Sequence, residues 1–134
     1  METEFIRNNI QAIMKDIRAV PVGNEHDMYM VKHKDCTIYI NYSFDTVPMP
    51  VVIFNVWRAT AELQIVNLDV LNDLNNKTTL GTHSVHKNVY FFRHAMWLTD
   101  ETIINADTIT NILSMAQQEA LHGYDRLKSS SVAD

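Results

Sequence analysis

The chain contains few of the residues that mark disulfide frameworks, catalytic loops or membrane spans. Its 134 residues include one cysteine, three glycines and three prolines. A single cysteine, Cys36, cannot form an internal disulfide, which is typical of proteins from a reducing compartment. The three glycines form no nucleophile elbow, phosphate-binding loop or dinucleotide fingerprint. Apolar runs are far shorter than the ~20 residues that cross a bilayer, and the acidic N-terminus lacks a signal-peptide pattern, so we expect a cytoplasmic protein without membrane association.

Charge argues against nucleic acid as a partner. Eleven lysine and arginine residues accompany sixteen aspartate and glutamate residues, which gives a net charge of −5. Proteins that bind nucleic acid usually carry a basic face that displaces counterions from phosphates. The densest basic group here is Lys-His-Lys at residues 32–34, directly followed by Asp35. We interpret this group as a solvated strand end or turn and expect no nucleic-acid partner.

Hydrophobic periodicity predicts a single α+β domain with the order α-β-β-β-α-β-β-α. An amphipathic helix is indicated by one stripe of isoleucines, Ile6, Ile10, Ile13 and Ile17. Alternating and β-branched residues predict strands at 27–32, 37–42, 51–61, 82–86 and 89–98, and helical spacing returns at 66–76 and 109–127. We expect an antiparallel sheet with helices packed mainly on one face. The domain should occupy residues 1–128, followed by a flexible C-terminal tail over 129–134.

Local signals predict where several elements begin and end. Residues 20–23 include a proline and should end the first helix. Asn67 is a candidate N-cap for the second helix, because its side chain can accept hydrogen bonds from the first helical N–H groups. Residues 87–88, Lys-Asn, should form a two-residue hairpin turn. That turn would place His83 across from Phe92.

No arrangement of residues in the sequence marks a catalytic or metal centre. The six histidines lie in different elements or, like His83 and His86, point to opposite faces of one strand. The single cysteine has an aspartate beside it, which opposes thiolate formation. We therefore expect a protein that is not an enzyme and that uses no metal or cofactor. One alternative stays open, a catalytic site assembled from distant residues such as Asp73, Arg93 and His94.

Two predicted strands, 51–61 and 89–98, carry apolar residues on both faces, although a half-exposed antiparallel sheet normally alternates apolar and polar residues. The candidate dimer or partner surface comprises Val51, Ile53, Trp57, Tyr90, Phe92, Met96 and Trp97. Three explanations stay open. Both faces could be buried within the monomer, one face could bind a second copy or a client segment, or an apolar ligand cavity could lie between sheet and helices.

The order of elements resembles the type III secretion chaperone fold and, within it, the YbjN-like proteins known as bacterial sensory transduction regulators. The local likeness lies in Leu-Asn-Asp-Leu-Asn at 71–75, the aromatic strand at 89–98, and Thr-Asp-Glu at 99–101, which should open the final helix. This resemblance implies a homodimeric, non-catalytic binding protein. In the secretion chaperones, extended effector segments wrap around apolar patches of the dimer. A chaperone-like or regulatory protein-binding module is therefore the expected function, with a ligand-sensing domain as the alternative.

Overall fold

The computed structural model describes residues 3–23, 27–33, 36–45, 49–62, 65–98 and 105–130. For residues 3 and 58–62 it describes the backbone only. The helices are α1 (Thr3–Asp16), α2 (Leu68–Lys77) and α3 (Ala106–Ser130). The strands are β1 (Val20–Pro21), β2 (Met28–His33), β3 (Cys36–Ser43), β4 (Val51–Glu62), β5 (Thr82–His86) and β6 (Val89–Trp97). They form one antiparallel sheet in the order β1-β2-β3-β4-β6-β5. The expected α+β class is confirmed.

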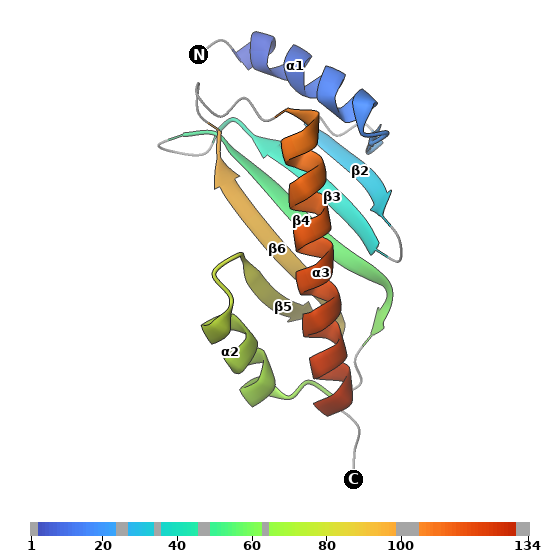
Figure 1. The fold of residues 1–134 in the computed structure, drawn as a ribbon, viewed down its shortest axis with the longest axis vertical. Helices are drawn as coiled ribbons and strands as arrows, with labels where there is room; N and C mark the ends of the chain where they lie inside the picture. Colours follow the sequence, from blue (N-terminus) through green and yellow to red (C-terminus); the bar gives the residue numbers. More distant parts are fainter. Residues whose placement is uncertain are drawn as a thin grey trace.

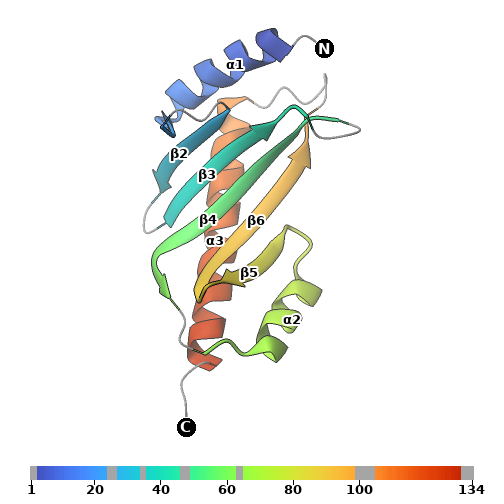
Figure 2. The same ribbon diagram turned by 180° about the vertical axis from the view of Figure 1, so that it is seen from behind.

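The helices pack on one side of this sheet. α3 crosses the inner face over the central strands β4 and β6, while α1 and α2 flank the two ends of α3 (Figure 1). Seen from behind in Figure 2, the sheet lies in front of α3, and no helix of the described chain crosses its outer face. The molecule therefore has two layers, and one surface of the sheet faces outward.

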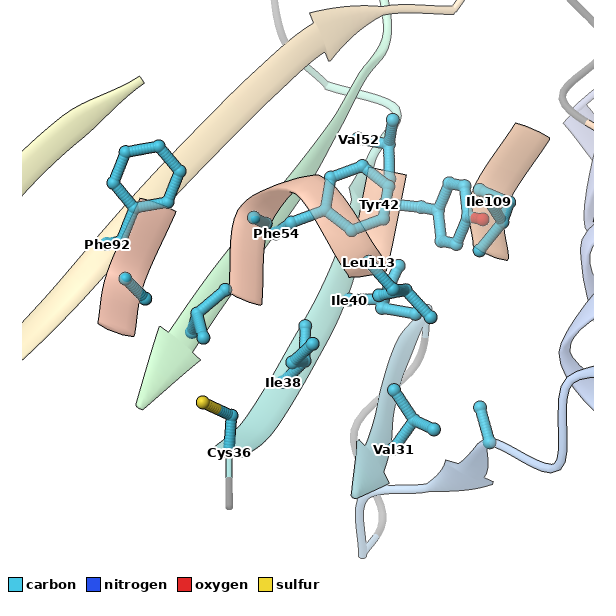
Figure 3. Close-up of a cluster of buried hydrophobic side chains, with 14 of the residues drawn as sticks. Val31, Cys36, Ile38, Ile40, Tyr42, Val52, Phe54, Phe92, Ile109 and Leu113 are labelled. Atoms are coloured by element: carbon cyan, nitrogen blue, oxygen red, sulfur yellow. The ribbon is translucent and has the colours of Figure 1, made fainter. Parts of the chain in front are cut away.

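The core lies between α3 and the inner face of the sheet. α3 begins after Asn105, whose side-chain oxygen accepts a 2.8 Å hydrogen bond from the Thr108 backbone N–H. Its buried residues recur at helical spacing: Ile109, Leu113, Ala116, Gln117, Ala120, Gly123, Tyr124 and Leu127. Figure 3 shows Ile109 and Leu113 among the inner-face side chains Ile38, Ile40, Val52 and Phe54. Each such large apolar side chain contributes about 1.5–3 kcal/mol when fully buried, so this layer is the main source of stability.

The first helix ends differently from the expectation. The backbone N–H of Ala19 bonds to the Met14 carbonyl and that of Arg18 to the Lys15 carbonyl, which is a Schellman motif. Arg18 occupies its left-handed position with φ 62°. Residues 20–21, expected only as a stop, then form β1, so the sheet has six strands where the sequence predicted five. A two-residue strand is short enough to carry Pro21 at the sheet edge.

Other local predictions are confirmed. Lys87 and Asn88 both have positive φ, as a two-residue hairpin turn requires, and His83 lies opposite Phe92. Asn67 caps α2. The expected helix start at 99–101 lies outside the described residues. α3 continues to Ser130, through the first two residues assigned to the tail, and residues 131–134 lie outside the described part of the chain.

The cap of α2 gives a direct test of this fold. The Asn67 side chain accepts hydrogen bonds from the backbone N–H groups of Asp69 (3.1 Å) and Val70 (3.3 Å). Asn67→Ala removes both, and we expect the free energy of unfolding to fall by about 1 kcal/mol in urea denaturation. Asn67→Asp keeps an acceptor at the same place and should retain wild-type stability. Equal losses in both variants would contradict the assignment of the cap.

Candidate protein-binding surface

The outer face of the sheet gathers apolar side chains from four neighbouring strands. Strand alternation points every second residue of β2, β3, β4 and β6 away from α3. We call the following residues the open face: Met28, Met30, Tyr39, Val51, Ile53, Trp57, Phe91 and Trp97. Most are half-buried by their neighbours, whereas Trp97 is 48% exposed. Contiguous apolar surface of this kind on a soluble domain usually marks an interaction site.

Cross-strand contacts order the centre of the open face. Trp57 of β4 stacks on Phe91 of β6 with 4.6 Å between ring centroids and 28° between planes. Arg93 lies 5.7 Å from the Phe91 centroid and donates a 2.9 Å hydrogen bond to the Asn55 side-chain oxygen. These contacts hold the aromatic rings in place before any partner binds, which lowers the entropy that binding must overcome.

The open face also differs in charge from the rest of the chain. The outward positions of residues 28–32, 37–43, 51–57 and 91–97 include no aspartate or glutamate, although the whole chain has a net charge of −5. Its cationic side chains are Lys32 and Arg93, one of which is already held by Asn55. Because few charges need to lose water there, packing against another protein carries a small desolvation cost.

The structure divides the seven residues expected on the partner surface into two groups. Val51, Ile53, Trp57 and Trp97 lie on the open face. Tyr90 and Phe92 are 0% exposed, and Met96 packs against the core. These last three lie on the inner face of β6, beneath α3, because they alternate with Phe91 and Trp97. Two-sided apolar character in β6 therefore has two causes, a buried core face and an uncovered outer face.

Sequence reasoning missed several members of the open face. Phe91 shares the alternation of Trp97, and that alternation alone could have identified it. Tyr39 lies opposite Asn55, and Met30 lies opposite Tyr39. These two could not have been assigned without the strand order, because a side chain joins this surface only when its strand lies next to β4.

The distant residues considered for a catalytic site do not come together. Arg93 lies on the outer face beside Asn55. His94 points to the inner face, where its ring lies 6.0 Å from that of Phe54 and its Nδ1 contacts the Leu80 carbonyl. Asp73 belongs to α2, where ion pairs with Arg126 (2.9 Å) and Lys77 (3.0 Å) hold its pKa below the usual range.

A buried polar cluster does exist, in the core beneath α3. His83 of β5 is 1% exposed, with Nδ1 2.7 Å from the Tyr90 hydroxyl and Nε2 3.1 Å from Glu119 Oε1. Asn75 of α2 holds the backbone of the same histidine, accepting from its N–H at 2.7 Å and donating to its carbonyl at 3.0 Å. The cluster thereby joins β5, β6, α2 and α3.

The protonation of His83 follows from its neighbours. Burial lowers the pKa of the imidazole, and the hydrogen bond to Glu119 opposes this without reversing it. In the neutral ring, Nε2–H donates to the Glu119 carboxylate, which can only accept, and Nδ1 accepts from the Tyr90 hydroxyl. Burial also raises the pKa of Tyr90, so its hydroxyl keeps its proton. Every ring nitrogen is satisfied, as a buried polar group requires.

Gly123 of α3 lets the helix approach this cluster. A Cβ at that position would lie 2.6 Å from the Tyr90 hydroxyl and 2.6 Å from His83 Cε1. Contacts this short are not tolerated, so the glycine is required by close packing. With α3 this close, His83 is 1% and Tyr90 0% exposed. We interpret the cluster as a structural contact that holds β5, β6, α2 and α3 together.

Among the described residues, no group of three histidine, cysteine, aspartate or glutamate side chains could hold a metal ion. None of the described helices combines the length and apolar character that crossing a membrane requires. In comparisons with known proteins, no family model matches the chain and no curated protein matches its sequence.

Gly123→Ala tests the close packing of α3 against His83 and Tyr90. In an exposed helix, alanine would stabilise by about 1 kcal/mol relative to glycine. Here we expect the opposite, a loss of about 2–3 kcal/mol in the free energy of unfolding, because the new Cβ overpacks against His83 and Tyr90. Gln118→Ala, at an exposed position of the same helix, should change stability by less than about 0.5 kcal/mol. A neutral or stabilising Gly123→Ala would contradict the packing described.

The lowered pKa of His83 predicts how stability depends on pH. Between its folded pKa and the ordinary value of 6.5, the unfolded chain binds the proton more tightly than the folded one. Stability should therefore be full above pH 6.5 and decline as the pH falls below it. Urea denaturation at several pH values measures this slope. His83→Gln should be less stable, and its free energy of unfolding should no longer fall with pH in this range. His86→Gln, at an exposed histidine of the same strand, should keep the pH dependence of the wild type.

Proposed function

We propose that this chain is a non-catalytic protein-binding module, chaperone-like or regulatory, whose functional unit is a homodimer. The observation that carries the proposal is the open face, a broad apolar and nearly uncharged surface on an otherwise acidic protein. The resemblance to secretion chaperones and YbjN-like proteins supports the same conclusion independently of the face.

The shape of the open face favours a second copy of the chain as its occupant. Peptide segments are usually captured at strand edges or in grooves, whereas two sheets pack face to face about 10 Å apart. The four strands of the open face, spaced ~4.8 Å apart with about seven residues each at ~3.3 Å, give a plane of roughly 440 Å². The accessible area of the side chains exceeds that of the plane, and each partner contributes ~800 Å² to a standard interface.

The residues of the open face are compatible with a dimer of twofold symmetry. In a twofold dimer the same patch meets itself, so an apolar, self-complementary surface is needed. The ordered Trp57–Phe91 pair and the half-exposed Trp97 supply aromatic groups of the kind enriched in interface cores. Apolar side chains elsewhere, such as Phe5 of α1 and Leu68 of α2, stay exposed in such a dimer and are available to a partner segment.

The dimer is tested by placing a charge on the open face. Trp97→Asp or Ile53→Asp would bury an unpaired carboxylate twice in a twofold interface, at a cost of about 3 kcal/mol or more. We expect dimer dissociation to rise by at least about 100-fold, so that light scattering coupled to size exclusion reports a monomer. Circular dichroism should confirm that the variants remain folded.

Leu68→Asp is the matched control. Leu68 is 66% exposed on α2, away from the open face, so its substitution introduces the same charge without touching the proposed interface. This variant should remain dimeric. A wild-type chain that is monomeric at all accessible concentrations, or a Trp97→Asp variant that stays dimeric, would overturn the proposal.

A further inference from the structure

A cleft lies at the edge of the sheet formed by β1 and β2. Its walls come from the end of α1, strand β2 and the first half of α3. Its volume is about 420 Å³, within the range of small-molecule sites. It is lined by Ile17, Arg18, Val20, Met30, Val31, Lys32, His33, Thr110 and Leu113. Figure 3 shows Val31 and Leu113 in the core layer, so the floor of the cleft is apolar.

Cationic groups lie around this apolar floor. The cationic side chains of Arg18 and Lys32 line the cleft beside His33, and neither of them takes part in the ion pairs formed among the described residues. Two other arginines are paired with carboxylates, Arg7 with Asp27 and Arg126 with Asp73. Cations that have no ion pair among the described residues and lie beside an apolar pocket in an acidic protein are complementary to a ligand that carries a negative head and an apolar body.

The backbone adds a donor at the same place. The Met28 carbonyl accepts from the Val22 N–H, so the main-chain groups of Met28, Met30 and Lys32 point toward the β1 side of β2. Pairing with β1 ends at Val20 and Met30. No described strand pairs with the Lys32 N–H on this side, and Lys32 lines the cleft.

Arg18 ends that pairing, and its conformation is costly. Continued pairing would place Arg18 opposite Lys32, but its left-handed backbone turns the chain away. The left-handed position of a Schellman motif is usually glycine, because a side chain there is strained. Arg18 adopts this strained backbone conformation at the cleft although glycine would avoid the strain. This indicates that its charged side chain has a role there.

From these observations we propose that the cleft binds a small amphipathic anion, with the apolar chain on Ile17, Val31 and Leu113 and the carboxylate or phosphate head at Arg18, Lys32 and the Lys32 backbone N–H. This site shares Met30 and Lys32 with the β2 border of the open face, but binding of the anion does not require the proposed dimer.

Octanoate is a suitable probe, with octanol and acetate as its matched controls. Octanol keeps the chain without the charge, and acetate keeps the charge without the chain. In titrations followed by the amide NMR signals of the full protein, octanoate should shift residues of α1, β2 and α3 that line the cleft and should bind at least about tenfold more tightly than either control. Octyl phosphate then distinguishes a phosphate head from a carboxylate one. Equal binding of octanoate and octanol, or shifts confined to the open face, would overturn the proposal.

Arg18→Gly separates binding from folding. Glycine suits the left-handed position, so the melting temperature should not fall, yet octanoate affinity should drop about threefold or more because a cation is lost. Arg18→Gly combined with Lys32→Gln should weaken octanoate about tenfold and leave octanol unchanged. Lys77→Gln removes one positive charge at α2, at the far end of the molecule (Figure 1), and should bind octanoate as the wild type does.

The same titration with Trp97→Asp keeps the two proposals distinguishable. This variant disrupts the open face at β6 but not the cleft at β2, so it should bind octanoate with wild-type affinity. Wild-type octanoate affinity in the doubly substituted Arg18 and Lys32 variant would show that the cationic groups do not form the site.

Discussion

Packing of one long helix on one face of the sheet is the constraint on which the rest of the structure depends. α3 has 25 residues and at 1.5 Å per residue extends about 37 Å, enough to cover the central strands from end to end. α1 and α2 are shorter and pack beside its ends (Figure 1). A sheet has two faces, and the described chain has no further helix for the second one. The open face is therefore a direct consequence of how few helices the described residues form.

Polar contacts fix where the shorter elements join this central layer. At one end, His83 connects β5 to Tyr90 and Glu119, and Asn75 brings α2 to the same strand. At the other end, Arg7 of α1 makes a two-point ion pair with Asp27, at 3.0 and 2.8 Å. Such polar contacts add less free energy than apolar burial, but the buried ones around His83 penalise alternative arrangements that would leave a polar group unpaired.

Each of the two proposed sites lies where the sheet has no covering helix or pairing strand among the described residues. Strand β4 and its neighbours continue their alternation although none of the described helices covers the outer side, which leaves apolar residues exposed. The ladder between β1 and β2 ends after two residues because Arg18 is left-handed, which leaves a short uncovered edge beside an apolar floor. In both cases the local pattern is stable within the monomer yet incomplete, and a partner or ligand would supply the missing contacts.

The sequence alone determined the elements apart from β1. Isoleucine spacing in α1, alternation in β3 and β4, the cap at Asn67 and the turn at Lys87 and Asn88 are local properties, so periodicity and backbone preference sufficed to predict them. Tertiary structure decided which face each strand buries: alternation divides β6 into Tyr90 with Phe92 and Phe91 with Trp97, but only the position of α3 makes the first pair core and the second surface. The cleft at Arg18 and Lys32, and the approach of Gly123 to His83, likewise depend on residues far apart in the chain. Local sequence patterns carry no record of such contacts, because helix and strand preferences act over a few residues only.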